Sequence, residues 1–223
     1  MGKSLISQKR GKGSSRYRVR QAAFLCRLSY KEGAGTVTGI IRDTGRTVPL
    51  AVVRYVDGST GYLLAREGVA LNQSTGDMVM PLAKIPESTH IFAIESFPNS
   101  GPVFCRAGGS AAIIVSKEKD MCKIQFPSKK TKELNSACRA IVGVPAGGGR
   151  GEKPWVKAGI RFKAKKARGQ HYPTISANRM NAVNHPFGGS YSGVNKPKTC
   201  SRNAPPGRKV GNIAARRCGK QKK

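Results

Sequence analysis

Residues 49–65 read PLAVVRYVDGSTGYLLA, and this stretch sets the pattern for the folded part of the chain. Its first half is rich in valine and contains Tyr55, and β-branched and aromatic side chains are enriched in strands. Asp57-Gly58 interrupts the run, and an Asp-Gly pair between two apolar segments is a strong hairpin signal. We therefore predict two antiparallel strands, at 49–56 and 60–65, joined by a tight turn.

Segments of similar, strand-like composition lie on both sides of this hairpin. We predict a strand at 36–41 before it and a short apolar strand at 78–82 after it. Five more strands follow, at 90–95, 103–106, 111–116, 121–126 and 137–144. Glycine-rich or charged turns separate them, and almost nothing has the periodicity of a long amphipathic helix. Short strands at this spacing predict an all-β fold made of small barrels.

The boundaries of four segments follow from changes in composition. We place a first barrel at residues 33–86 and a second at 87–160, with the boundary near Pro86. A basic extension at 1–32 precedes the barrels and another at 161–223 follows them. The C-terminal extension has too few large apolar side chains for a core of its own. We expect it to be irregular and ordered by its partner, apart from one or two helical turns within the cation run 163–168.

The charge of the chain is concentrated at its two ends. The sequence has 41 Lys+Arg and 11 Asp+Glu, a formal net charge of +30. Residues 1–32 contribute +8 and residues 150–223 contribute +18, whereas the segment between them contributes only +4. Cationic arms repel themselves until a polyanion neutralises them, and nucleic acid is the obvious polyanion.

Other classes of protein fit the sequence poorly. No run approaches the ~18 apolar residues of a membrane helix. The start lacks a secretory apolar stretch, although its basic, Ser-containing composition leaves a transit peptide open as an alternative. The six cysteines form no C-x-x-C pair and lie at no zinc-like spacing from a histidine, so we expect free thiols and no metal site. Trp155, the only tryptophan, is expected in the core, with a stacking platform as the alternative.

The glycine run at 143–150, GVPAGGGR, suggests a phosphate-binding loop. A nucleotide-binding loop needs Gly-Lys followed by Ser or Thr and then a helix. Neither is present, since Lys153 is followed by Pro154. We predict instead that the glycines let a phosphodiester chain approach the peptide N–H groups. The RNA-contacting residues predicted here are Gly147, Gly148, Gly149 and Arg150.

The stretch from His185 to Gly189, HPFGG, contains the only histidine of the chain that lies in a recognisable motif. An imidazole titrates near neutral pH and can act as an acid or a base. No Ser, Cys or carboxylate lies at a relay spacing, and the nearest acid in sequence is Glu152. We therefore predict that His185 hydrogen-bonds a phosphate or a 2′-hydroxyl, with Gly188 and Gly189 beside it, and that the chain is not an enzyme. Catalysis by His185 alone stays open as an alternative.

The remaining predicted RNA contacts are cations of the two extensions. In the N-terminal extension they are Lys9, Arg10, Lys12, Arg16, Arg18 and Arg20. In the C-terminal extension they are Lys163, Lys165, Lys166, Arg168, Lys196, Arg208, Lys209, Arg216 and Arg217. Tyr17 lies between Arg16 and Arg18 of the N-terminal extension, and it either stacks on a base or packs on the backbone of its own arm.

Three motifs occur in an order that is typical of one family. They are AIVGVPAGGGR at 140–150, HPFGG at 185–189 and APPGRKVGNIAARR at 204–217. With these motifs the chain resembles the universal L-two family of large-subunit ribosomal proteins, in the eukaryotic and archaeal branch called L-eight in eukaryotes. KRGKGS at 9–14 and the stretch 80–87 extend the resemblance over almost the whole chain.

The resemblance implies an OB-fold-like barrel followed by an SH3-like barrel, with basic termini that thread the large-subunit rRNA. It implies a structural constituent of the large subunit, near the peptidyl-transferase region, that supports subunit association and translation. His185 matches a family segment that reaches toward that centre, where the chemistry belongs to RNA. The implied partners are large-subunit rRNA and neighbouring large-subunit proteins, with no membrane, no small-molecule substrate and no cofactor beyond Mg²⁺ at the RNA interface. The implied location is the cytoplasm, with passage through the nucleolus during assembly if the source is eukaryotic.

Two positions depart from the family pattern. Ser190 stands where the family usually has a third glycine, and Asn195 stands where it usually has Gly before Lys-Pro. The alternative function is that of a DNA-compacting or chromatin-type basic protein, for which cationic tails would serve equally well. Two barrels with glycine loops favour a shaped RNA surface over that alternative.

Overall fold

The computed structural model describes residues 2–189 and 197–216. The chain divides into two compact units. One, which we call the folded unit, comprises Arg20–Ile160. The other, which we call the arm unit, comprises Met1–Val19 together with Arg161–Lys223.

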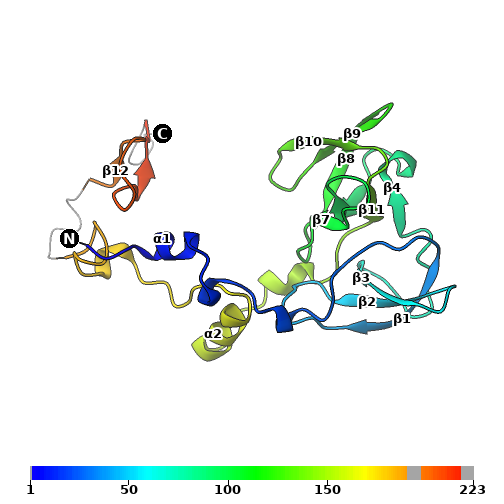
Figure 1. Ribbon diagram of the computed structural model, residues 1–223, viewed down its shortest axis with the longest axis horizontal. Coiled ribbons are helices and arrows are strands. Elements are labelled where there is room, and N and C mark those ends of the chain that lie inside the picture. The colour runs from blue at the N-terminus through cyan, green and yellow to red at the C-terminus, as the bar shows by residue number, and fades with distance from the viewer. Residues whose placement is uncertain (1, 190–196, 217–223) are drawn as a thin grey trace. The chain divides into compact units, whose positions relative to one another are not determined.

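The hairpin expected within residues 49–65 is present in the folded unit. β2 (Leu50–Tyr55) pairs antiparallel with β3 (Thr60–Leu64), and β1 (Gly35–Ile41) pairs with the other edge of β2 (Figure 1). Asp57 closes the turn, since its Oδ1 accepts hydrogen bonds from the backbone N–H and the hydroxyl of Ser59, at 2.9 Å and 2.6 Å. These two bonds lower the pKa of Asp57 below its ordinary value.

A second sheet of six strands has the order β10-β9-β8-β5-β11-β4. Along the chain its members are β4 (Val79–Pro81), β5 (His90–Phe92), β8 (Ala112–Glu118), β9 (Met121–Gln125), β10 (Thr131–Asn135) and β11 (Arg139–Val142). β6 (Ile94–Glu95) and β7 (Pro102–Phe104) form a separate antiparallel pair. The all-β fold class predicted from the sequence is confirmed.

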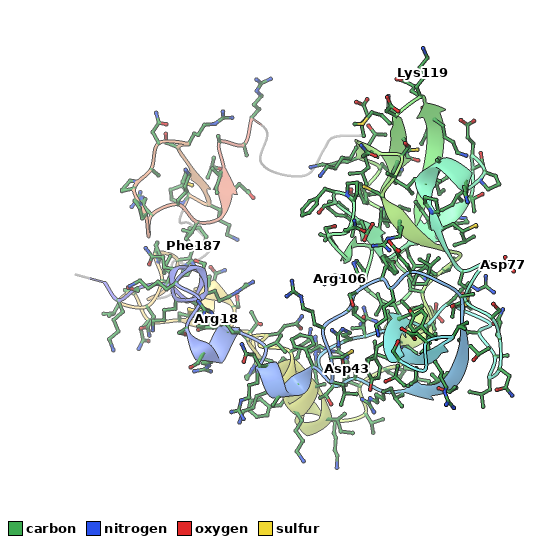
Figure 2. The ribbon with its side chains drawn as sticks, turned by 45° about the vertical axis from the view of Figure 1, so that its right-hand side comes forward. Arg18, Asp43, Asp77, Arg106, Lys119 and Phe187 are labelled. Atoms are coloured by element: carbon green, nitrogen blue, oxygen red, sulfur yellow. The ribbon has the colours of Figure 1, made fainter. Side chains whose placement is uncertain are left out.

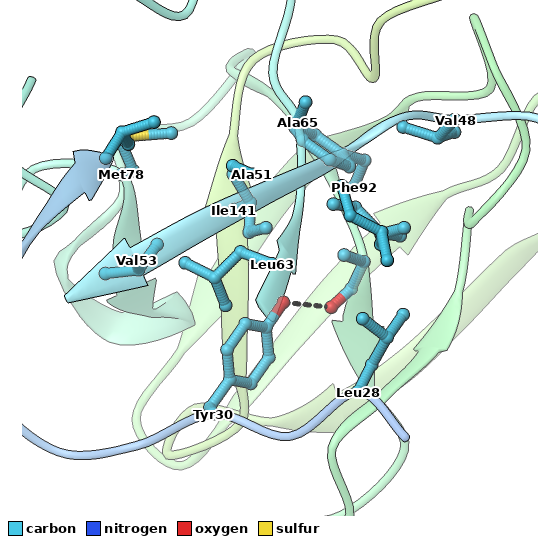
Figure 3. Close-up of a cluster of buried hydrophobic side chains, with 14 of the residues drawn as sticks. Leu28, Tyr30, Val48, Ala51, Val53, Leu63, Ala65, Met78, Phe92 and Ile141 are labelled. Carbon is cyan, nitrogen blue, oxygen red and sulfur yellow. Dashed lines mark hydrogen bonds between the residues drawn. The ribbon is translucent and has the colours of Figure 1, made fainter. Parts of the chain in front are cut away.

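Two hydrophobic cores hold these sheets. The first contains β1, β2 and β3 side chains together with Phe92 and Ile141 of the six-stranded sheet, as Figure 3 shows for part of the cluster. Within it, the Tyr30 hydroxyl donates a hydrogen bond to the Ala93 carbonyl oxygen. Burial of Tyr30, reinforced by the charge of Glu95, raises its pKa well above the ordinary value. The second core is formed by Leu82, Ile85, Ile91, Ile94, Ala112, Ile114, Cys122, Ile124, Leu134, Cys138 and Ala140.

Strand pairing and core packing cross two of the segment boundaries drawn on the sequence. β4, on the first-barrel side of residue 86, pairs with β11 on the other side. Leu28 and Tyr30, from the extension drawn at 1–32, are buried in the first core. The N-terminal arm of the structure therefore ends at Val19. The division between two barrels at residues 86 and 87 stays a prediction.

Among the described residues, regular structure is sparse outside the sheets. The α-helices are α1 (Ile6–Gly11) and α2 (Ala158–Ala167), and β12 (Thr199–Cys200) pairs in parallel with β13 (Asn212–Ile213). Short 3₁₀ helices lie at Ser15–Tyr17, Gln21–Ala23, Leu82–Lys84, Gly148–Gly151 and Ala177–Arg179. The rest of the described arm unit is irregular, as expected. Trp155 is 47% exposed, so its expected place in the core was wrong.

Candidate nucleic-acid interface

The arm unit contains no acidic residue. Its sequence has 22 Lys and Arg and no Asp or Glu, whereas the folded unit has 19 basic and 11 acidic residues. Both ion pairs found among the described residues, Arg46–Asp43 and Arg139–Glu95, belong to the folded unit. No acidic side chain of the arm unit can therefore offset its charge, which favours an external anion as its partner. Figure 2 shows the nitrogen-tipped side chains that surround Arg18 and Phe187 in this unit.

The N-terminal arm presents its cations from a short, anchored helix. Leu5 is buried, and its backbone N–H donates to Oε1 of Gln8 at 2.8 Å as α1 begins. The backbone N–H of Lys3 donates to the Val183 carbonyl oxygen at 2.8 Å, which ties the arm to the C-terminal extension. The cations predicted here as RNA contacts are all exposed, namely Lys9, Arg10, Lys12, Arg16, Arg18 and Arg20. The last of them, Arg20, lies at the start of the folded unit.

The second group of predicted contacts lies on and after α2. Lys163 and Lys166 are exposed, whereas Lys165 and Arg168 are half-buried. Nζ of Lys165 donates to Oε1 of Gln170 at 2.8 Å. The helix has ten residues, so it is longer than the one or two turns expected from the cation run.

The glycines of the 143–150 run pack against the protein itself. A Cβ added to Gly108 would lie 2.6 Å from the carbonyl oxygen of Gly147, and one added to Gly109 would lie 2.7 Å from Cα of Gly148. The structure thus uses Gly147 and Gly148 for a close backbone contact within the folded unit. Gly149 and Arg150 are exposed beside this contact, and approach of a phosphodiester chain to the run stays a prediction.

His185 lies in a compact loop that fixes its protonation. Its Nδ1 accepts a hydrogen bond from the Phe187 backbone N–H at 3.0 Å. Burial lowers the pKa of His185 below the ordinary value of 6.5. The ring is therefore neutral at pH 7 and carries its proton on Nε2, which can donate to an anionic or hydroxyl oxygen.

The two glycines of this loop also serve packing. A Cβ on Gly188 would collide with the carbonyl oxygens of Met180 and Asn181, and Gly189 has a φ of +79°. Its N–H donates to the Met180 carbonyl oxygen at 2.9 Å. Glycine is thus required at both positions to fold the loop that holds His185.

The predicted contacts of the C-terminal tail are only partly within the described residues. Arg208, Lys209 and Arg216 are exposed. Lys196 and Arg217 lie outside the residues that the structure describes, as do the two departures from the family pattern, Ser190 and Asn195.

Three arginines of the folded unit form a cluster that sequence reasoning missed. Arg27, Arg46 and Arg106 line a cavity of about 720 Å³ together with Phe24. The Arg46 guanidinium lies 4.9 Å from the centre of the Phe24 ring, and its Nη2 donates to the Cys26 carbonyl oxygen at 2.7 Å. Guanidinium groups beside an aromatic face can hold a phosphate and a base. These arginines are far apart in sequence, so no local pattern marks the cluster.

Two kinds of feature are absent from the described residues, a metal-binding cluster and a membrane-spanning helix. No group of three or more His, Cys, Asp or Glu side chains in residues 2–189 and 197–216 could hold a metal ion. Within the same residues, no helix is long and apolar enough to cross a membrane.

Comparisons with known proteins identify the relatives of the chain. Residues 75–210 match the family described as "Ribosomal Proteins L2, C-terminal domain". The large ribosomal subunit protein uL2 of Archaeoglobus fulgidus is 44% identical over 98% of this chain and 99% of its own length. The protein of the same name from Methanothermobacter thermautotrophicus is 42% identical over the full length of both chains. That of Methanobrevibacter smithii is 41% identical over 98% of this chain and 99% of its own length.

Proposed function

Since the chain belongs to the ribosomal protein L2 family, we propose that it is a structural, non-enzymatic constituent of the large ribosomal subunit and binds large-subunit rRNA. Its folded unit is an all-β body, and its arm unit supplies most of the cations that meet RNA phosphates. The family resemblance inferred from the sequence is confirmed by relatives that match over nearly the whole chain.

One observation carries this proposal. The arm unit has 22 basic residues and no Asp or Glu, and the predicted cationic contacts that fall in its described part are exposed or half-buried. Each Lys or Arg that meets a phosphate releases condensed counterions, which favours binding without any sequence-specific contact. Base edges and 2′-hydroxyls then need only a few directed groups, such as Nε2 of His185.

The folded unit adds a second kind of contact. The cluster offers the guanidinium donors of Arg27 and Arg106 around an open cavity, whereas Arg46 is paired with Asp43 and lies over the Phe24 ring. We propose that this cluster binds rRNA backbone, because planar guanidinium groups match phosphate geometry in a bidentate way. It lies next to the Gly108–Gly147 contact, since the Gly108 N–H donates to Oγ1 of Thr47, which lines the same cavity.

Two finer aspects of the function concern the His185 loop and the association of the two subunits. We propose that the His185 loop approaches the peptidyl-transferase region and that the protein supports association of the two subunits. His185 would position RNA as a neutral hydrogen-bond donor, since no acid, Ser or Cys among the described residues is hydrogen-bonded to its ring. The partners of the chain in the subunit would include other large-subunit proteins.

We also propose that the protein needs no cofactor and no small-molecule substrate. Mg²⁺ prefers carboxylate and phosphate oxygens, and the arm unit has no Asp or Glu side chain. Any Mg²⁺ at that interface would therefore be held by RNA oxygens. The protein would work in ribosomes of the cytoplasm, and in a eukaryotic cell it would pass through the nucleolus during assembly.

Competition binding tests this function. The full chain should prefer a structured large-subunit rRNA fragment to duplex DNA of equal length, and it should co-sediment with large subunits until high salt releases it. Equal affinity for the two nucleic acids would favour the DNA-compacting alternative. Absence of the chain from large subunits at low salt would overturn the proposal.

A further inference from the structure

We propose that the two arms together form a binding site for a single rRNA nucleotide that is extruded from its stack. The site is the cavity between Met1–Val19 and the first part of Arg161–Lys223, all within the arm unit. This inference rests on the proposed function, because it assigns a ligand to a part of the same RNA-binding unit. It adds that the N-terminal arm and the C-terminal extension act on the same nucleotide, although more than 140 residues separate them in sequence.

The two arms are packed directly against one another. A Cβ on Gly169 would lie 2.7 Å from the carbonyl carbon of Arg18, so the two backbones touch there. The rings of Tyr17 and His171 have centroids 6.4 Å apart. Together with the Lys3–Val183 hydrogen bond, these contacts make the cavity a feature of the protein chain.

The cavity has the size of a small-ligand site. Its volume is about 1010 Å³. Known small-molecule pockets span about 300–1,000 Å³, so a base with its ribose and phosphate fits, whereas an RNA duplex does not. Extruded nucleotides are a common target of sequence-specific RNA recognition, because their unstacked bases can be held on aromatic side chains.

The lining provides a separate partner for each part of a nucleotide. Arg10 of the N-terminal arm and Lys165 and Arg168 of the C-terminal extension line the cavity, so cations from both arms can meet one phosphate. No acidic residue lines it. Tyr17 and His171 offer aromatic faces on which a base can stack. Apolar side chains such as Leu5 and Met180 complete the wall.

His171 adds an unmet hydrogen-bonding need at this place. Its Nδ1 is covered by neighbouring atoms and has no hydrogen-bond partner among the described residues. A covered polar atom without a partner costs free energy. A small rotation of the ring when a nucleotide enters would let this nitrogen pair with a base edge or a 2′-hydroxyl. The imidazole of His171 can therefore hydrogen-bond the nucleotide as well as stack on its base.

Crosslinking tests whether both arms hold the same nucleotide. A photoreactive benzophenone amino acid is placed at position 17 in one full-length variant and at position 171 in another, and each is assembled with large-subunit rRNA. We expect both variants to crosslink to one nucleotide or its immediate neighbour, and that nucleotide to be unpaired. Crosslinks that map to paired nucleotides, or to sites far apart in the rRNA, would overturn the proposal.

Two pairs of matched variants give an independent readout. Tyr17→Leu should weaken binding of the full chain to the rRNA fragment by about fivefold or more, the loss of one base–aromatic stack, while Tyr17→Phe keeps the ring and the affinity. Arg10→Gln should expose the crosslinked nucleotide to chemical modification. Arg54→Gln, the same charge change at an exposed arginine of the folded unit, should not. Equal effects within either pair would overturn the cavity site. The proposed function fails separately, when the unaltered chain shows no salt-sensitive binding to rRNA.

Discussion

Replacing Glu95 by glutamine should destabilise the folded unit far more than its small change in shape suggests. Glu95 is fully buried, and its carboxylate accepts hydrogen bonds from the Gly101 N–H at 3.1 Å, the Arg139 N–H at 2.9 Å and Nη2 of Arg139 at 3.2 Å. In Glu95→Gln the charge disappears, and the new amide NH₂ replaces one of the two oxygens that these donors face. Arg139 then loses its ion-pair partner while four-fifths of its side chain stays buried, and it keeps only neutral acceptors such as Oδ1 of Asn99, at 2.8 Å.

The expected loss follows from that burial. Removing one partner of a buried ion pair costs about 3–5 kcal/mol, and the partial exposure of Arg139 places the loss near the lower end, at about 3 kcal/mol. That is a large part of the roughly 5–15 kcal/mol that stabilises a typical domain. Urea unfolding followed by circular dichroism measures it, with Glu133→Gln as the control, because Glu133 is exposed on the edge strand β10. A Glu95→Gln value within about 0.5 kcal/mol of the control would refute the reasoning.

Three further predictions concern other parts of the chain. In thermal denaturation, Gly108→Ala should lower the free energy of unfolding by about 1–3 kcal/mol, because its Cβ would lie 2.6 Å from the Gly147 oxygen. Gly151→Ala is the control and should be near neutral, because nothing lies within 4 Å of the Cβ it would add. Because the pKa of Tyr30 is raised in the folded protein, the unfolded chain releases the hydroxyl proton at lower pH, and stability should fall above about pH 10. Tyr30→Phe should remove that part of the decline. A Tyr30→Phe variant with the same pH profile of stability as the unaltered chain would contradict this prediction. Burial of His185 lowers its pKa, so an NMR titration of its ring should have a midpoint below 6.5, and a midpoint at or above 6.5 would show that the loop does not desolvate it.

Strands with apolar alternation could be predicted from the sequence, and strands without it could not. β1, β2 and β3 match the expected segments within about two residues, because their buried positions carry Val, Leu and Tyr. β10 was not predicted, since only Leu134 of its five residues is buried. Its place in the sheet comes from pairing with β9, which a local pattern does not encode.

The candidate site was predictable where charge decides it and unpredictable where tertiary contacts decide it. The cations of the two arms could be named from composition, because no neighbouring acid competes for them. The roles of Gly147 and Gly188 could not, because a glycine that packs on its own chain and one that admits RNA look the same in sequence. Arg46 and Arg106 come together only through the fold, since 60 positions separate them.

The salt dependence of rRNA binding tests most directly whether the arm unit carries the affinity for RNA. One full-length variant replaces the six cations of the N-terminal arm by glutamine: Lys3, Lys9, Arg10, Lys12, Arg16 and Arg18. A control variant replaces six exposed cations of the folded unit: Arg54, Lys84, Lys119, Lys123, Lys129 and Lys130. Each lost phosphate contact reduces the slope of log affinity against log salt by about 0.7–0.9, so the arm variant should lose about 4–5 units of slope and the control about 1 or less. Equal slopes for the two variants, or a control that loses more than the arm variant, would contradict this role of the arm unit.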